Sequence, residues 1–294
     1  MLHRSFRSAR VLGRSCFCRS AVTRGRFWGI YARYDGQKGE FVIGRFNLHN
    51  ETFLGTVEGT RVHGNGSTYK LSELRVLAPT CPGKIVGVGL NYTDHARELA
   101  TKVPEQPTIF LKPSTSVIGP GESIVHPAIS SRVDFEGELA FVIGQRCATV
   151  EDSNRVVLGY TCLNDVTARD LQIEDGQWTR SKSFDTFAPL GPFIATELDP
   201  RNARIVTRVN GRQRQSSNTR ELIFDVDYLV RFISRIMTLE VGDVITTGTP
   251  AGVGQLRAGD SVDVDITGIG TLSNNVISEQ DEKLSATNCL KPHV

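Results

Sequence analysis

The stretch "RVDFEGELAFVIG", residues 132–144, carries three carboxylates at alternate positions, Asp134, Glu136 and Glu138, directly before an apolar run. Successive side chains of a strand point to opposite faces, so these three carboxylates are predicted to share one face. The apolar run predicts that the strand enters the core. Buried carboxylates without a partner are costly, so this face must meet water, basic side chains or a cation.

A hard divalent cation, Mg2+ or Mn2+, is one partner that carboxylate oxygens suit. A solvated sheet face is the alternative interpretation of the same alternation. A third ligand would have to come from elsewhere, and "LNDVTARD" (163–170) offers Asp165 at a predicted strand-to-helix junction. Asp165 could also cap that helix or pair with Arg169, four residues on.

Around this stretch the chain alternates predicted strands and a few helices. Strands are predicted at 84–90 and 155–165, helices at 94–102, 166–177 and 225–240, and a hairpin at 204–215 turning on Asn210-Gly211. Strands outnumber helices and are joined mostly by turns. We therefore expect an α+β fold with a coiled, barrel-like sheet.

The segment "LAPTCPGK" (77–84) holds two prolines and a glycine and is the best candidate for a linker. We expect a small β-rich module over residues 26–76 and a larger catalytic domain over 77–294. Residues 1–25 precede both.

Charge is distributed unevenly along the chain. Residues 1–34 hold eight of the 34 basic residues and none of the 32 acidic ones, so the rest of the chain is mildly acidic. An Arg-rich, Ser-rich, acid-free start is typical of an organellar transit peptide, which we assign to residues 1–25 and which predicts a mitochondrial location. The alternative is a basic N-terminal extension that is not a targeting signal, on a cytoplasmic protein. Neither a nucleic-acid surface nor a membrane span is predicted.

The segment "NYTDHARE" (91–98) places His95 and Glu98 three residues apart, on one face of the predicted helix. A carboxylate next to a histidine orients the ring and makes it more basic, as a general base requires. Taken alone, the pair is more typical of an exposed helix turn. Lys182 and Lys112, each considered singly, are likewise typical of solvated lysines.

Six segments in this order carry a specific resemblance: "GLNYTDHARE", "IFLKPSTSVIGPG", "VDFEGELAFVIG", "GYTCLNDVTARDLQ", "SKSFDTFAPLGP" and "TTGTPAGVG". Together they resemble the fumarylacetoacetate hydrolase (FAH) family over about residues 77–275, and more weakly over 26–76. The segment around residues 176–192 looks closest to the subgroup of FAH domain-containing protein 2 and bacterial catabolic isomerases. The acylpyruvases that decarboxylate oxaloacetate share the same motifs.

The resemblance implies a role for each candidate residue. It implies that Mg2+ or Mn2+ is held by Glu136, Glu138 and Asp165, that His95, Glu98 and Lys182 are catalytic, and that Arg169, Gln172 and Thr249 contact substrate oxygens. Asp134 becomes a neighbour of the metal ligands. Asn91 stands where larger family members carry a fourth acidic ligand. A mixed β-roll and a homodimer are also implied.

These residues predict a metal-dependent enzyme that acts on a small β-keto or acylpyruvate-type acid through an enolate. C–C bond hydrolysis, oxaloacetate decarboxylation and keto–enol tautomerisation all fit such a site. A non-catalytic metal-binding scaffold derived from such an enzyme is the alternative.

Overall fold

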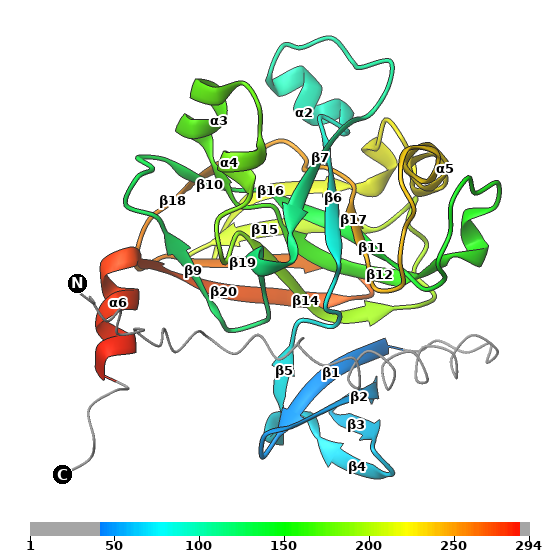
Figure 1. Cartoon of the computed structure of the whole chain (residues 1–294), viewed down its shortest axis with the longest axis vertical. Coiled ribbons are helices and arrows are strands. Elements are labelled where there is room, and N and C mark those ends of the chain that lie inside the picture. Colours follow the sequence, from blue (N-terminus) through cyan, green and yellow to red (C-terminus); the bar gives the residue numbers. More distant parts are fainter. Residues whose placement is uncertain (1–41, 289–294) are drawn as a thin grey trace, which may run out of the picture. The chain divides into compact units, whose positions relative to one another are not determined.

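The computed structural model describes residues 42–288 (Figure 1). The predicted transit peptide and the first residues of the predicted N-terminal module lie outside the described residues, so both stay predictions. The helices are α2 (Thr93–Glu98), α3 (Arg169–Asp175), α4 (Thr179–Lys182), α5 (Val226–Ile236) and α6 (Glu279–Asn288).

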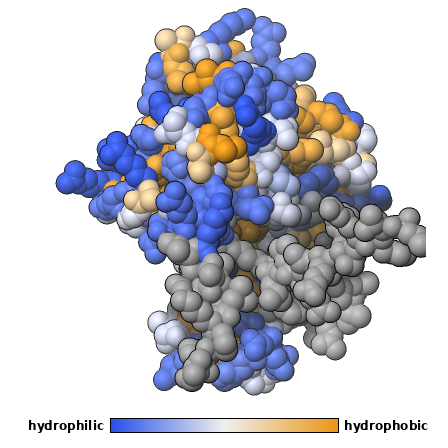
Figure 2. All heavy atoms as spheres, turned by 60° about the vertical axis from the view of Figure 1, so that its left-hand side comes forward, coloured by the Kyte–Doolittle hydropathy of each residue, from blue (hydrophilic) through white to orange (hydrophobic). Residues whose placement is uncertain are grey.

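Within residues 42–288, no helix combines the length and the apolar character that crossing a membrane requires. Figure 2 shows one face of the molecule, on which hydrophobic residues form separate groups among hydrophilic ones.

Most strands belong to one twelve-stranded sheet with the order β4-β3-β2-β1-β14-β12-β11-β17-β6-β7, with β5 on β1 and β8 on β14. Its strands are β1 (Val42–Leu48), β2 (Glu51–Glu58), β3 (Arg61–Gly64), β4 (Ser67–Lys70), β5 (Arg75–Leu77), β6 (Lys84–Gly89), β7 (Thr108–Pro113), β8 (Val117–Ile118), β11 (Gly137–Ile143), β12 (Val157–Asn164), β14 (Ala188–Ala195) and β17 (Val244–Thr246).

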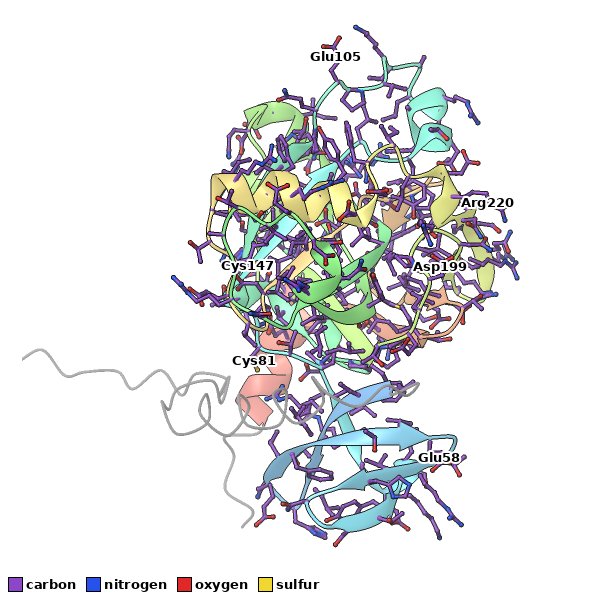
Figure 3. The ribbon with its side chains drawn as sticks, turned by 90° about the vertical axis from the view of Figure 1, so that its right-hand side faces the viewer. Glu58, Cys81, Glu105, Cys147, Asp199 and Arg220 are labelled. Atoms are coloured by element: carbon purple, nitrogen blue, oxygen red, sulfur yellow. The ribbon has the colours of Figure 1, made fainter. Side chains whose placement is uncertain are left out.

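Strands β1 to β4 form successive antiparallel hairpins, and β5 pairs with β1, over a small cluster of aromatic and aliphatic side chains. Glu58 marks the end of β2 in Figure 3. Strand β1 also pairs with β14, with Val42 opposite Ala195. The β-rich character expected for this region is therefore present in its described part. The domain limits at residues 76 and 77 stay a prediction.

Two smaller sheets complete the strands. One has the order β13-β10-β18, and the other has the order β16-β15-β19-β20-β9. Their strands are β10 (Val133–Phe135), β13 (Thr167–Ala168), β18 (Gly254–Leu256), β9 (Ser123–His126), β15 (Arg204–Val209), β16 (Arg212–Asn218), β19 (Ser261–Ile266) and β20 (Gly270–Ser278). The α+β class is confirmed. In the described part of the chain each sheet has two free ends, so the coiled arrangement does not close into a barrel.

Local sequence signals explain two elements well. Helix α5 buries Val226, Leu229, Val230 and Ile233, whose spacing is that of one helical face, and the Asp225 side chain accepts a hydrogen bond from the Tyr228 N–H at its start. Asn210 and Gly211 both have positive φ, 52° and 73°, as a two-residue hairpin turn between β15 and β16 requires.

The acidic stretch departs from the expectation of one continuous strand. Strand β10 ends at Phe135 and β11 begins at Gly137, so Glu136 lies at a break between two sheets. Every residue of β11 is buried, as expected, because this strand lies between β12 and β17. The break moves Asp134 into a different sheet from Glu138.

Candidate active site

The strand break is what brings Asp165 to the acidic stretch. Gly137 of β11 pairs with Asn164 of β12, so the residue that follows β12 lies beside Glu136. Two hydrogen bonds hold this junction: the Glu136 N–H donates to Asn164 Oδ1 (3.0 Å), and the Asp165 N–H donates to the Glu136 carbonyl (2.8 Å). Asp165 therefore reaches the other carboxylates through the register of one hairpin.

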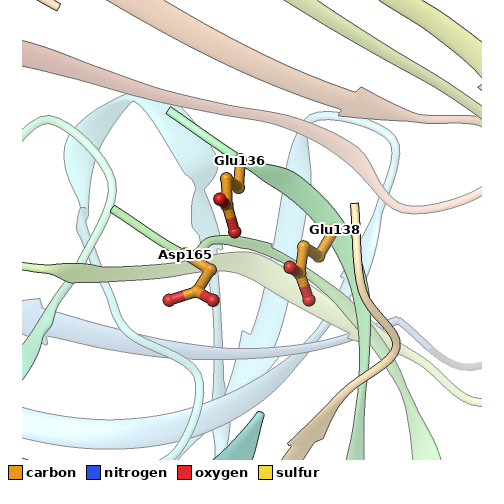
Figure 4. A group of neighbouring side chains, drawn as sticks. All are labelled: Glu136, Glu138 and Asp165. Carbon is orange, nitrogen blue, oxygen red and sulfur yellow. The ribbon is translucent and has the colours of Figure 1, made fainter. Parts of the chain in front are cut away.

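Glu136, Glu138 and Asp165 form a buried carboxylate trio (Figure 4). One carboxylate oxygen of each residue lies within 4.8 Å of the other two. Oxygens that share a hard divalent cation lie about 2.0–2.6 Å from it, hence at most about 5 Å from each other. The donor chemistry and the spacing of the carboxylate trio both fit a single Mg2+ or Mn2+ ion.

Two buried lysines contact the carboxylate trio. Lys182 Nζ lies 2.9 Å from Glu136 Oε2 and 2.6 Å from Asp165 Oδ2, and it also sits 5.0 Å from the centroid of the Phe110 ring. Lys112 Nζ lies 2.6 Å from Asp165 Oδ1 and donates to the Val166 carbonyl (3.2 Å). The predicted position of Lys182 at the site therefore agrees with its contacts, whereas its catalytic role stays a prediction.

The contacts of Arg169 correct two sequence interpretations. Its guanidinium pairs with Asp134 (2.9 Å) and Glu136, so it does not form the pair with Asp165 that their spacing suggested. Helix α3 begins at Arg169 with Ala168 at the N-cap position, and the short strand β13 separates it from Asp165. Asp165 is therefore not the helix cap.

Charge within the carboxylate trio is balanced unevenly. Burial alone would raise the pKa of Glu136, but Lys182 and Arg169 outweigh it and lower the pKa to about 2. Burial, followed by the negative charges of Asp165 and Glu136, raises the pKa of Glu138 well above its ordinary value. Among residues 42–288 no lysine or arginine forms a salt bridge with Glu138, which instead accepts a hydrogen bond from the Gly248 N–H (2.9 Å). A divalent cation would supply the missing positive charge.

Helix α2 carries the predicted base. His95 Nδ1 lies 2.9 Å from Glu98 Oε2, and the Glu98 carboxylate also accepts a hydrogen bond from the Gly252 N–H (3.1 Å). The loop 248–252 therefore touches the carboxylate trio at Gly248 and the His95–Glu98 dyad at Gly252. These contacts place the dyad next to the loop that borders the trio.

The predicted substrate-binding residues are already engaged in internal contacts. Gln172 Oε1 accepts a hydrogen bond from Arg169 (2.6 Å). The buried Thr249 hydroxyl donates to the Gly137 carbonyl (3.0 Å) and accepts from Gln215 (2.8 Å). Contact with substrate stays a prediction for Arg169, Gln172 and Thr249.

Asn91 has a structural role that explains the missing acidic residue at this position. Its side-chain amide donates to the carbonyls of Phe224 (2.9 Å) and Thr247 (2.8 Å), while its oxygen accepts from the Phe224 N–H (2.7 Å). A carboxylate could accept here but could not donate, so an acidic side chain would leave the buried Thr247 carbonyl and the partly buried Phe224 carbonyl without this partner.

Lys112 is the residue that sequence reasoning missed. It is fully buried and bonded to Asp165, yet it was indistinguishable from a solvated lysine in the sequence. The available signal was its place directly after the apolar residues of "IFLKP" (109–113), because a charged side chain that becomes buried needs a partner.

Asp170 supports a prediction on acid stability. Partial burial would raise its pKa, but hydrogen bonds from Ser130 and Ser131 outweigh this and lower the pKa to about 2. A lowered pKa means that the ionised group stabilises the folded state above the ordinary pKa of 3.8, and that this contribution is lost as pH falls from there toward about 2. We expect Asp170→Asn to destabilise the protein at pH 6 and to weaken this acid dependence.

Urea unfolding of both proteins between pH 2 and 6 measures the effect. Asp185→Asn, at an exposed aspartate, is the matched control. The prediction would be contradicted if the free energy of unfolding changed with pH in the same way for wild type and Asp170→Asn.

Comparisons with known proteins agree with this geometry. The family model described as "Fumarylacetoacetate (FAA) hydrolase C-terminal" matches residues 84–277. An uncharacterized protein of Archaeoglobus fulgidus is 54% identical over 240 residues, which covers 80% of this chain and 96% of the relative. A mitochondrial oxaloacetate tautomerase of Rattus norvegicus is 43% identical over 220 residues, 70% of each chain.

Two solved structures extend the comparison to the fold. A 5-carboxymethyl-2-hydroxymuconate delta-isomerase from Mycobacterium smegmatis has a TM-score of 0.77 at 44% identity, covering 81% of this chain and 99% of the other. A maleylpyruvate hydrolase from Sphingobium sp. SYK-6, solved with manganese(II) and pyruvate, has a TM-score of 0.70 at 30% identity with the same coverage.

Proposed function

The chain belongs to the fumarylacetoacetate hydrolase family and is an enzyme of that type, and from this premise we propose that it catalyses Mg2+- or Mn2+-dependent keto–enol chemistry on a small β-keto or acylpyruvate-type acid. The buried carboxylate trio is the observation that carries the proposal. Three carboxylates lie close together, and one of them forms no salt bridge with a lysine or arginine among residues 42–288, so a divalent cation would stabilise the site.

A divalent cation held by Glu136, Glu138 and Asp165 would polarise the keto oxygen of the substrate and stabilise the negative charge of an enolate. Lys182 adds a second positive charge at the same place, since its ammonium group contacts both Glu136 and Asp165. Arg169 and Gln172, which are bonded to each other at the edge of the trio, would orient the substrate carboxylate.

His95 would move the proton in this scheme. Glu98 holds the imidazole in one orientation through a hydrogen bond at Nδ1, which leaves Nε2 to accept a proton from the substrate and return it. In tautomerisation one proton leaves the enol hydroxyl and one is delivered to the adjacent carbon. In hydrolysis the same base would deprotonate a water molecule.

Tautomerisation of an oxaloacetate-type acid is our first choice among the possible reactions. Support comes from the names of relatives at similar identity, the oxaloacetate tautomerase of Rattus norvegicus and the isomerase of Mycobacterium smegmatis. Hydrolysis of an acylpyruvate is the second candidate. The His95–Glu98 dyad and the likeness to a maleylpyruvate hydrolase support it.

A mitochondrial location and a homodimer complete the proposal. The name of the relative from Rattus norvegicus and the basic composition of residues 1–34 support the location. A relative from Archaeoglobus fulgidus is 54% identical over 80% of this chain, so similarity over that part does not by itself support a mitochondrial location. The homodimer rests on the family resemblance alone.

Calorimetry with Mn2+ and oxalate, a mimic of enolpyruvate, tests the proposal. We expect one Mn2+ ion per chain, oxalate binding only after Mn2+ is bound, and loss of enol-to-keto conversion of oxaloacetate when EDTA removes the metal. Full activity in EDTA would contradict metal dependence. Mn2+ binding without oxalate binding or turnover would instead favour the non-catalytic scaffold.

A further inference from the structure

The edge strand β16 contacts both halves of the candidate active site. It lies at one end of the five-stranded sheet, and loop 248–252 approaches it closely. A Cβ atom on Gly252 would lie 2.2 Å from the Arg214 carbonyl oxygen, so only glycine fits at this approach, and its φ of 98° also favours glycine. The strand and the loop are therefore in direct backbone contact.

Gln215 is the residue of β16 that faces this contact, and its side chain is fully buried. Its Oε1 accepts a hydrogen bond from the Gly137 N–H (3.0 Å). Its Nε2 donates to the Thr249 hydroxyl and to the Pro250 carbonyl, each at 2.8 Å. One amide thus ties strand β11 to loop 248–252.

The position of Gly137 makes this tie relevant to the carboxylate trio. Gly137 lies between Glu136 and Glu138, and its own carbonyl accepts from Thr249, which closes a ring of hydrogen bonds with Gln215. A Cβ on Gly137 would lie 2.1 Å from Thr207 Oγ1, so the backbone here is packed directly against the polar side chains of β15 and β16.

Loop 248–252, which Gln215 contacts, also contacts the His95–Glu98 dyad. Loop 248–252 donates to the Glu138 carboxylate from Gly248 and to the Glu98 carboxylate from Gly252. Ser217, two residues after Gln215, donates to Asp94 Oδ2 (2.6 Å) at the start of the helix that carries His95. Strand β16 therefore contacts strand β11, loop 248–252 and helix α2.

We propose that Gln215 is a positioning residue that sets the spacing between the carboxylate trio and the His95–Glu98 dyad. The inference rests on the proposed function, because the spacing matters only if the trio and the dyad act on one substrate. An amide suits the task because it accepts at one atom and donates twice at the other. Gln215 touches neither the reacting atoms nor a ligand carboxylate.

Gln215→Met tests the inference, because methionine matches the shape of glutamine and forms none of these hydrogen bonds. Gln213→Met is the matched control, since Gln213 is an exposed glutamine on the same strand. For each protein we would measure Mn2+ affinity, oxalate affinity of the Mn2+-loaded protein, and the rate of enol-to-keto conversion of oxaloacetate. Amide hydrogen exchange of the peptides covering 93–98 and 248–252 is measured without metal.

We expect Gln215→Met to lower kcat about 100-fold, as a misplacement of about 1 Å does. Its Mn2+ dissociation constant should change by less than about tenfold, below the range of about 10- to 100-fold seen when a residue that orients a metal ligand is lost. Exchange of both peptides should accelerate, whereas Gln213→Met should match wild type throughout.

The two hypotheses fail in different ways. If the wild-type protein shows no Mn2+-dependent turnover, the proposed function is refuted. Unchanged amide hydrogen exchange in Gln215→Met would then also refute the claim that Gln215 holds strand β11 and loop 248–252 together. If wild type is active, unchanged kcat in Gln215→Met overturns the inference. Equal losses of kcat and Mn2+ affinity also overturn it, because they would place Gln215 among the supports of the metal ligands only.

Discussion

Replacing Glu138 with glutamine is expected to abolish Mn2+ binding and turnover together while the protein stays folded. Glu138 is the member of the carboxylate trio whose charge no lysine or arginine among residues 42–288 balances through a salt bridge, so the cation should depend on it strongly. Losing a residue that merely orients a metal ligand costs about 10- to 100-fold in affinity, and losing a ligand should cost more than about 100-fold. Glutamine keeps an oxygen that can accept from the Gly248 N–H.

The same substitution should not destabilise the metal-free protein at neutral pH. The pKa of Glu138 is raised above its ordinary value of 4.5, so the folded state binds its proton more tightly than the unfolded state does. The stability of the metal-free protein therefore falls as pH rises above 4.5, and Glu138→Gln should weaken this decline. Thermal unfolding in EDTA across pH 4.5–8 measures the effect.

Calorimetry and turnover assays complete the test of Glu138→Gln. Glu105→Gln is the control, because Glu105 is an exposed glutamate in the loop after α2 (Figure 3). Turnover that persists in Glu138→Gln, or in EDTA-treated wild type, would refute the metal site. Loss of folding in the variant would instead assign Glu138 a structural role.

Replacing His95 with alanine is expected to lower proton-transfer turnover about 100- to 10,000-fold, the usual contribution of a general base. Its ring lies 2.9 Å from Glu98, and Glu98 is connected to the carboxylate trio through loop 248–252, without a direct hydrogen bond between these described side chains. Mn2+ and oxalate affinity should therefore stay close to wild type. Any decarboxylation of oxaloacetate should be lost far less, because it needs only an electron sink.

Separate readouts for enol loss, C–C cleavage and CO2 release distinguish these outcomes. His63→Ala is the matched control, since His63 lies on β3 in the N-terminal hairpins and is bonded to Thr68. Equal losses of proton transfer and decarboxylation in His95→Ala would mean that His95 is not the base. A large loss of Mn2+ affinity would place it among the supports of the metal site.

Several parts of this fold follow from short stretches of sequence. The apolar spacing of residues 226–236 predicts the buried face of α5, and Asn210-Gly211 predicts the hairpin between β15 and β16. The spacing of three between His95 and Glu98 places them on one helical face, and their side chains do meet. In each case the partners are close in the chain, so local backbone geometry is enough to bring them together.

The carboxylate trio is different, because Asp165 is distant from Glu136 in the sequence. Alternation suggested two of the three acids. Asp165 was a candidate at a predicted strand-to-helix junction, with helix capping as an alternative role, and the family resemblance favoured it as the third ligand. The pairing of Gly137 with Asn164 and the strand break at Glu136 place Asp165 in the trio. The break also explains why Asp134 pairs with Arg132 and Arg169 and is not one of the three clustered carboxylates.

By itself, the sequence determined the buried face of α5, the turn at Asn210-Gly211 and the pairing of His95 with Glu98 on α2. These features depend on residues that are close to each other in the chain. Only the tertiary structure decided which polar groups face one another: Lys112 with Asp165, Arg169 with Asp134, and the Gln215 amide with the backbone between two carboxylates. The physical reason is that strand register and the burial of charge are set by packing between distant segments, which no local pattern encodes.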